Sequence, residues 1–266
     1  MIYINSDKVK NIEFNSNNMA IVIDFDKTLT SGNSADSWDA SGKILGDDFK
    51  FESTCLYKKY EPIERSYEIE YCKKEKAMNE WYSKCMGLYY KYDLTKEKII
   101  KSIDTSNLIF RKGSKEFLQE MYLRNVPVIL LSAGIGNVIE RSLKKNNCYF
   151  NNIHIISNFV EFDDNGNMIK FDDTKMIHSL NKTLKNNLPK ENEKIFKERK
   201  YKLLFGDLIE DKKMIGKEDL ENTLSVCFIN ERTEDNIEVF NNNFDVVLTK
   251  EDSNFDVAKK IVFNNV

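Results

Sequence analysis

The chain has 266 residues, of which 41% are hydrophobic and 31% are charged, and its formal net charge is −3. These values are typical of a soluble globular protein with one large core, or a core and a smaller domain, and they exclude a disordered chain. The balanced charge offers no basic surface for a nucleic acid or a membrane, and no apolar run is long enough to span a bilayer. Five cysteines without a C-x-x-C pair, and a polar N-terminus without an apolar leader, predict a cytoplasmic protein with reduced thiols.

The first predicted strand is the apolar run from Met19 to Ile23, which ends in the turn Asp24-Phe25-Asp26-Lys27-Thr28. Residues 33–106 then lack the alternation of a strand and are rich in Glu, Lys, Tyr and Met. Amphipathic stretches at 64–72, 74–90 and 96–103 predict helices there. We therefore expect a helical cap to be inserted directly after the first strand and its acidic turn.

The rest of the chain alternates between predicted helices and strands. Helices are expected at 114–123 and 137–145, and a polar helical stretch is interrupted near Pro189. Strands are expected at 126–131, 202–205, 224–229 and 244–248, with a hairpin of 153–162 and 168–171 around an Asp-Asn-Gly-Asn turn. This alternation predicts an α/β fold with a doubly wound, Rossmann-like parallel sheet. The core domain would comprise residues 1–32 and 107–266, and the cap domain 33–106.

Carboxylates follow two of the predicted strands. Asp24 and Asp26 come after the first, and Asp207 and Asp211 come after the strand at 202–205. The carboxyl ends of neighbouring parallel strands meet at one sheet edge, where ligands bind in open α/β sheets. Two carboxylates about 4 Å apart repel by roughly 4 kcal/mol at an effective dielectric constant near 20. A hard cation with oxygen ligands, Mg²⁺, would relieve this repulsion.

An all-oxygen site of this kind indicates phosphate chemistry. Asp24 would attack phosphorus and form an aspartyl-phosphate, while Asp26 would protonate the leaving oxygen and later deprotonate the attacking water. Ser132, with the N–H groups that follow it at Ala133 and Gly134, would hold phosphate oxygens at a helix N-terminus. Lys182 is the candidate for an added positive charge.

Each of these residues also has a purely structural interpretation. Asp207 and Asp211 have the spacing of a helix cap and a first-turn acid, and Ser132 is a good capping residue. Without further signals Lys182 would be a solvated lysine. Trp38 and Trp81 are more often packing anchors than platforms for a base. The order of the motifs along the chain favours the functional interpretation for the acids.

Taken together, Asp24-x-Asp26-x-Thr28, strand-terminal Ser132, Lys182 and Gly206-Asp207-x-x-x-Asp211 resemble the four motifs of the haloacid dehalogenase superfamily. The chain is most similar to the cytosolic pyrimidine 5′-nucleotidases of type III, and the resemblance rests on four stretches. These are Ser132-Ala133-Gly134-Ile135-Gly136-Asn137-Val138-Ile139-Glu140, Asn152-Ile153-His154-Ile155-Ile156-Ser157-Asn158, Ile177-His178-Ser179-Leu180-Asn181-Lys182 and Phe244-Asp245-Val246-Val247-Leu248. The resemblance implies a 5′-nucleotidase, a Mg²⁺-dependent phosphomonoesterase for a small phosphorylated substrate.

The resemblance also implies particular ligands. Mg²⁺ would be bound by Asp24, the backbone carbonyl of Asp26 and Asp207, with Asp211 in support. Glu80, in Asn79-Glu80-Trp81-Tyr82, matches a cap glutamate that lies near the base. The chain departs from the family at Cys85-Met86-Gly87, where a histidine is common, and over residues 31–38. Both departures fall where the part of the substrate beyond its phosphate would lie.

Four other functions compete with a nucleotidase. A phosphatase for another small metabolite, such as phosphoserine, fits the same motifs and the altered cap. A receiver-like signalling module would carry its acids early and would have no large cap. A catalytically dead binding protein would have lost Asp24 or Asp26, and a dehalogenase would not need an acid at position 26. The sequence makes no prediction of the oligomeric state.

Overall fold

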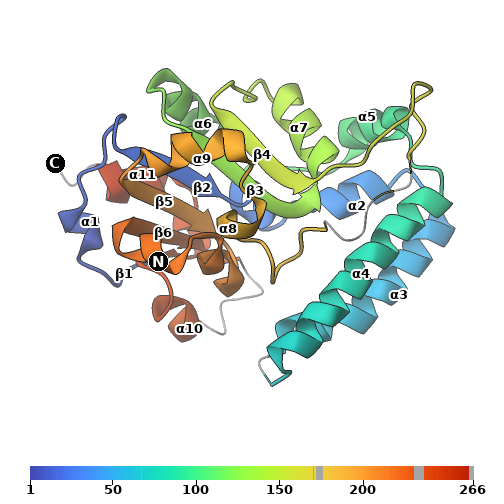
Figure 1. Ribbon diagram of the computed structural model, residues 1–266, viewed down its shortest axis with the longest axis horizontal. Coiled ribbons are helices and arrows are strands. Elements are labelled where there is room, and N and C mark those ends of the chain that lie inside the picture. Colours follow the sequence, from blue (N-terminus) through green and yellow to red (C-terminus); the bar gives the residue numbers. More distant parts are fainter. Residues whose placement is uncertain (67, 170, 172–175, 231–236, 264–266) are drawn as a thin grey trace.

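The computed structural model describes residues 1–66, 68–169, 171, 176–230 and 237–263. Its centre is a seven-stranded sheet in the order β1-β7-β6-β5-β2-β3-β4, parallel except for β1, which runs antiparallel to β7 (Figure 1). The strands are β1 Ile2–Ile4, β2 Met19–Ile23, β3 Val128–Ile135, β4 Ile153–Asn158, β5 Tyr201–Gly206, β6 Thr223–Phe228 and β7 Val246–Leu248. The predicted α/β fold with a mostly parallel sheet is confirmed.

Helices cover both faces of this sheet. Successive residues of a strand point to opposite sides. In β2, Ile21 packs in one apolar cluster with Phe117, and Val22 in another with Phe196. The first cluster is covered by α6 Ser114–Leu123, α7 Gly136–Lys145 and α11 Phe255–Phe263, and the second by α8 Leu184–Asn187 and α9 Lys190–Lys197. Two short helices, α1 Lys8–Asn11 and α10 Ile237–Asn241, lie near the outer strands (Figure 1).

Helices make up most of the described part of the segment 33–106. It contains α2 Ser37–Gly42, α3 Asp47–Arg65, α4 Tyr71–Lys91 and α5 Lys96–Thr105. Helices α3 and α4 form a long antiparallel pair that projects away from the sheet, whereas α2 and α5 lie beside α7 (Figure 1). Trp81 of α4 stacks on Tyr60 of α3 with ring centroids 5.8 Å apart, which is the packing role expected for it. The division into two domains at 32/33 and 106/107 stays a prediction.

Three expectations about individual elements were wrong. The helix expected at 64–72 spans a break, because Ser66 and Glu70 have extended backbone angles between α3 and α4. The run 153–158 is a parallel strand of the central sheet, and the expected hairpin is reduced to one bridge, Phe162 to Met168. Residue 170 of its second arm lies outside the described residues. Strand β3 begins after Pro127, which has no N–H to donate, and extends to Ile135.

The other expected strands and helices are confirmed, with small shifts at their ends. Sequence reasoning missed β1 and most of α3. Among the described residues, none of the helices combines the length and the apolar character that a membrane crossing needs.

Candidate active site

The carboxyl end of β2 is the centre of the site. Strand β2 lies between β3 and β5, and Ile23 is in register with both Leu130 and Phe205. The backbone N–H of Asp24 donates to the carbonyl of Phe205 at 3.1 Å. The strands that follow β2 in the chain are placed first on one side of it and then on the other. Such a reversal of strand order leaves a crevice at the carboxyl ends of the strands, where open α/β sheets bind ligands. The expectation that these three strands are parallel neighbours is confirmed.

Three acids and one lysine form a buried cluster at this edge. Asp24, Asp207 and Asp211 are 5%, 6% and 1% exposed, and each offers a carboxylate oxygen within 4.8 Å of the others. Lys182 Nζ lies 2.6 Å from Asp24 Oδ1 and 2.7 Å from Asp211 Oδ1. Lys182 precedes α8, and its backbone N–H donates to the carbonyl of His178 at 3.1 Å. The structure therefore brings together four residues that the sequence singled out.

The cluster carries more negative charge than Lys182 balances. Burial raises the pKa of Asp24 to about 6, although Lys182 opposes that rise. Burial, and then Asp211 and Asp24, raise the pKa of Asp207 to about 8. Burial alone would lower the pKa of Lys182, but Asp211 and Asp24 raise it above its usual value, so Lys182 is an ammonium. A buried group of oxygen ligands with surplus negative charge fits a hard divalent cation.

Neighbouring groups fix the orientation of the two later acids. Asp211 Oδ2 accepts from the backbone N–H groups of Asp207 at 2.9 Å and Leu208 at 3.0 Å. Asp207 Oδ1 accepts from the Thr28 hydroxyl at 3.2 Å, and its Oδ2 accepts from Asn230 Nδ2 at 3.0 Å. Asp211 thus caps the turn after β5 and contacts Lys182 at the same time. The structural interpretation of Asp211 as a capping acid therefore holds, and its functional interpretation stays a prediction.

The side chain of Asp26 is not one of the clustered carboxylates. Its Oδ1 accepts from the backbone N–H of Ser37 at 2.8 Å, and its Oδ2 accepts from the Ser37 hydroxyl at 2.6 Å. Burial, and then the charge of Asp36, raise the pKa of Asp26 well above its ordinary value. A carboxyl with a raised pKa is suited to giving and taking protons near neutral pH.

The last residues of β3, where its register shifts, are the third part of the site. Ser132 Oγ accepts from the backbone N–H of Gly134 at 3.0 Å, so the hydroxyl is left to donate to a ligand. The carbonyl of Ala133 accepts from Asn158 Nδ2 at 2.9 Å and from Trp38 Nε1 at 3.2 Å. A Cβ on Gly134 would lie 2.0 Å from Ser37 Oγ, so no larger residue fits there without movement.

Glu80 is the predicted site residue that the structure does not bring to the acids. About half of its side chain is exposed, and its carboxylate pairs with Lys84 and, at 3.7 Å, with Lys59. On α4 it is two residues from Tyr82, whose ring lies 5.9 Å from that of His178. Residues two apart lie on nearly opposite faces of a helix. A base contact by Glu80 is therefore not supported by its placement.

Sequence reasoning missed Arg111 and Asn230. Buried Arg111 donates to the carbonyls of Thr28 and Ser253, both at 2.8 Å, to the carbonyl of Lys27, and to Asn230 Oδ1 at 2.9 Å. Lys27 has a φ of 60°, which non-glycine residues rarely adopt, and Asn230 also donates to its carbonyl at 3.2 Å. Arg111 and Asn230 thus fasten the turn after Asp24. The spacing of residues in the sequence does not identify Arg111 and Asn230, because their contacts are mostly with backbone groups.

His178 lies beneath the cap beside Tyr82. Its Nδ1 accepts from the backbone N–H of Leu180 at 3.2 Å, and its Nε2 is buried with no partner among the described residues. Burial lowers the pKa of His178 from 6.5 to about 4. The imidazole is therefore neutral at physiological pH, with its proton on Nε2.

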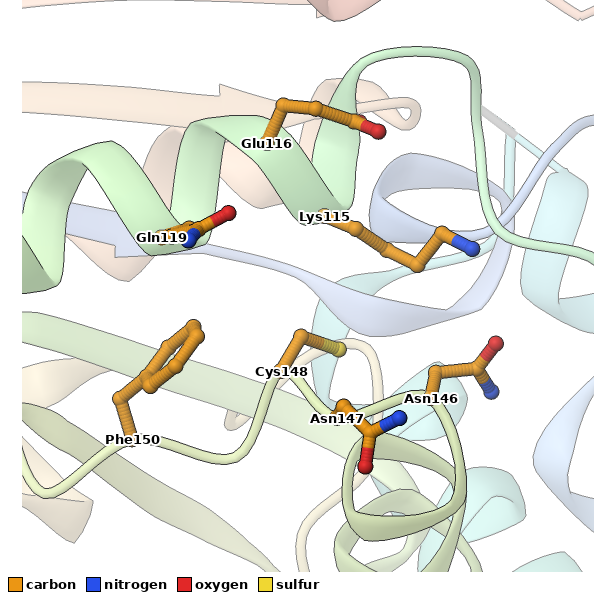
Figure 2. A pocket seen from close by; sticks show the side chains of 7 residues that line it. All are labelled: Lys115, Glu116, Gln119, Asn146, Asn147, Cys148 and Phe150. Atoms are coloured by element: carbon orange, nitrogen blue, oxygen red, sulfur yellow. The ribbon is translucent and has the colours of Figure 1, made fainter.

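A shallow surface hollow of about 380 Å³ lies apart from these residues (Figure 2). It is lined by Lys115, Glu116, Gln119, Asn146, Asn147, Cys148 and Phe150 from α6 and the segment after α7. Helix α7 begins at the edge of the sheet that carries the acids and runs away from it, so this hollow is not part of the site.

Comparison with known proteins identifies the family. The family described as Pyrimidine 5′-nucleotidase (UMPH-1) matches residues 25–265. The chain belongs to this family. As a member of the pyrimidine 5′-nucleotidase family it is a phosphomonoester hydrolase, and the predicted family resemblance is confirmed.

Two kinds of relative support this assignment. The chain is 30% identical over 259 residues to a 7-methylguanosine phosphate-specific 5′-nucleotidase A of Xenopus laevis, covering 92% of this chain and 86% of the relative. It is 30% identical over 250 residues to the corresponding enzyme of Homo sapiens, covering 88% and 81%. The crystal structure of cytosolic 5′-nucleotidase IIIB bound to cytidine has a TM-score of 0.83 at 25% identity, over 98% of this chain and 92% of that one. A substrate-bound phosphoserine phosphatase, with a TM-score of 0.54 and 18% identity over 91% and 96%, shares the fold alone.

Replacing Arg111 with Met should destabilise the protein. The carbonyls of Lys27 and Thr28 would lose charged donors that water cannot replace in the core. We expect the free energy of unfolding to fall by about 3 kcal/mol. Urea denaturation measures this, with Arg124→Met, which loses a surface ion pair to Glu120, as the matched control within about 0.5 kcal/mol. Equal stability of the two variants would contradict the role given to Arg111.

The buried neutral His178 should make the protein less stable in acid. The pKa of His178 in the folded protein, about 4, lies below its value in the unfolded chain. Its contribution to the free energy of unfolding is therefore complete above pH 6.5 and is lost as pH falls toward 4. Between pH 7 and pH 5 the wild type should lose about 2 kcal/mol more unfolding free energy than His178→Asn. Urea titrations at both pH values test this, and an identical pH dependence would refute the neutral, buried state.

Proposed function

We propose that this protein is a Mg²⁺-dependent phosphohydrolase of nucleoside 5′-monophosphates that works through an aspartyl-phosphate on Asp24. The observation that supports this most strongly is the buried contact of Asp24 with Lys182, beside Asp207 and Asp211, in a member of a 5′-nucleotidase family. The cytoplasmic location predicted from the cysteines is part of the same proposal.

The metal site would use oxygen atoms that already lie close together. Asp24, the backbone carbonyl of Asp26 and Asp207 would hold Mg²⁺, and Asp211 would support them through its hydrogen bonds to the turn after β5. When bound, the cation would neutralise phosphate charge so that an anionic carboxylate can approach phosphorus. Lys182 would add a fixed positive charge on the other side of Asp24.

Two proton-coupled steps would complete the reaction. Asp24 attacks phosphorus, the bond from phosphorus to the ester oxygen breaks, and Asp26 gives that oxygen its proton. A water molecule then attacks the phosphoryl group, gives its proton to Asp26, and the bond to Asp24 breaks. The surroundings of the two acids differ as these roles require, because burial raises the pKa of Asp26, whereas at Asp24 Lys182 opposes the rise that burial causes.

Donors around Asp24 would hold the phosphate oxygens. The hydroxyl of Ser132 can donate, because its oxygen already accepts from Gly134. The backbone N–H of Ala133, which precedes α7 where the helix N-terminus favours an anion, would add a second donor, whereas the N–H of Gly134 is directed at Ser132 Oγ. Lys182 would contribute an ammonium. This set of donors is suited to the three terminal oxygens of a monoester.

The mouth of the site suggests which nucleotides to test. Half-buried Trp38 and Tyr82 form an aromatic pair with ring centroids 5.5 Å apart. Asp36 and Asp39 lie in the same segment as Trp38. Aromatic faces near acids favour a cationic base. A 7-methylguanosine monophosphate is therefore a second candidate substrate beside the pyrimidine monophosphates.

Asp24→Asn should abolish turnover, because an amide cannot form the acyl-phosphate intermediate. Asp26→Asn should instead lose the proton transfer, which is worth about 10²–10⁴-fold in rate. Phosphate release from CMP at saturating Mg²⁺ measures both variants. Substantial residual activity in Asp24→Asn would refute its role as nucleophile.

The nucleotidase activity should depend on Mg²⁺ and prefer nucleotides. Removal of Mg²⁺ with EDTA should abolish phosphate release until Mg²⁺ is restored, because without the cation the carboxylates would repel the phosphate. The rate is to be compared as kcat/KM for CMP, UMP, 7-methyl-GMP, GMP, AMP and phosphoserine. Equal values for phosphoserine and the nucleotides would contradict a nucleotidase and favour a phosphatase for another metabolite.

A further inference from the structure

Ser37, the first residue of α2 in the cap segment, holds both carboxylate oxygens of Asp26. The Ser37 backbone N–H donates to Oδ1 at 2.8 Å and the hydroxyl donates to Oδ2 at 2.6 Å. Ser37 is fully buried, so bulk water does not compete for these bonds. A bidentate contact of this kind fixes the rotation of the Asp26 carboxyl group about its last side-chain bond.

Ser37 is itself firmly anchored on the core. Its hydroxyl oxygen accepts from the backbone N–H of Ile135 at 3.2 Å, and a Cβ on Gly134 would lie 2.0 Å from it. The next residue, Trp38, donates from Nε1 to the carbonyl of Ala133 at 3.2 Å. The start of α2 is therefore fastened to the last residues of β3, and it holds Asp26 from a fixed position.

The hydroxyl group has a property that the backbone N–H lacks. A backbone N–H can only donate, so it can hold Asp26 only through a carboxyl oxygen that accepts the hydrogen bond. A serine hydroxyl donates to a carboxylate and, after rotating, accepts from a carboxylic acid. Ser37 can thus keep Asp26 in place both before and after Asp26 transfers its proton.

From this geometry we infer that Ser37 is a positioning residue for the acid–base work of Asp26. The inference rests on the proposed function, because it assigns Ser37 to the two steps in which Asp26 moves a proton. It predicts that loss of the hydroxyl slows protonation of a poor leaving group and the hydrolysis of the aspartyl-phosphate. Attack by Asp24 on a substrate with a good leaving group should be spared, because that step needs no proton from Asp26.

The experiment compares Ser37→Ala with the wild type on two substrates at saturating Mg²⁺. With CMP, whose leaving oxygen needs a proton, steady-state turnover should fall about 100-fold. With p-nitrophenyl phosphate, the first-turnover release of p-nitrophenolate in stopped flow should keep its wild-type rate. The later steady-state rate should fall about 100-fold, since aspartyl-phosphate hydrolysis still needs Asp26, so a burst appears.

Three further variants sharpen the comparison. Asp26→Asn should show the same burst, and Ser37→Thr, which keeps the hydroxyl, should restore most of the lost rate. Ser41→Ala is the matched control, because Ser41 is a buried serine of the same helix that donates to the carbonyl of Trp38 and to Tyr89. It should leave both substrates nearly unchanged.

Two outcomes for Ser37→Ala would overturn the inference. Equal slowing of the first turnover and the steady state would mean that Ser37 only supports the fold, and an unchanged CMP rate would mean that its hydroxyl does nothing for Asp26. If the wild type released phosphate from none of CMP, UMP, 7-methyl-GMP, GMP and AMP, the proposed nucleotidase would fail. The p-nitrophenyl phosphate measurements would still test Ser37, because they need only the phosphatase chemistry.

Discussion

The contact of Lys182 with two buried acids is the interaction on which the site depends. At about 4 Å two like charges repel by roughly 4 kcal/mol at an effective dielectric constant near 20, and three acids converge here. Lys182 lies within 2.7 Å of oxygens of both Asp24 and Asp211, and it lowers the cost of keeping them ionised. It does not remove that cost, because the pKa of Asp207 still rises to about 8. The remaining negative charge is what the proposed cation would neutralise.

The sheet makes this convergence possible. Because β2 lies between β3 and β5, the turns after three strands share one edge, and residues from distant parts of the chain meet there. The cap segment completes the arrangement through α2, whose first residue, Ser37, holds Asp26. Asp24 and Asp26, two residues apart in sequence, are thus held by different partners. Lys182 contacts Asp24 and Ser37 contacts Asp26, which gives the two acids the different surroundings that the proposed roles of nucleophile and acid need.

The parts of the site that follow apolar strands could be predicted from the sequence. Asp24, Ser132 and Asp207 were found because a buried strand marks where a functional side chain lies. Arg111 and Ser37 were missed because they act through backbone carbonyls and a cap–core contact, which no spacing records. The break between the cap helices α3 and α4 was also harder to predict, because charged, amphipathic sequence continues on both sides of it. The assignment of Glu80 as a base-contacting residue stays a prediction, since a motif match does not say which helix face meets the core.

The central claim is that Asp24 carries the phosphoryl group during the reaction. The most direct measurement mixes the protein with Mg²⁺ and substrate, quenches it in acid within the first turnovers, reduces the acyl-phosphate with borohydride and locates the modified residue by mass spectrometry. The account predicts that Asp24 is converted to homoserine and that omission of substrate prevents the conversion. Turnover without any modification, or modification at a residue other than Asp24, would contradict it.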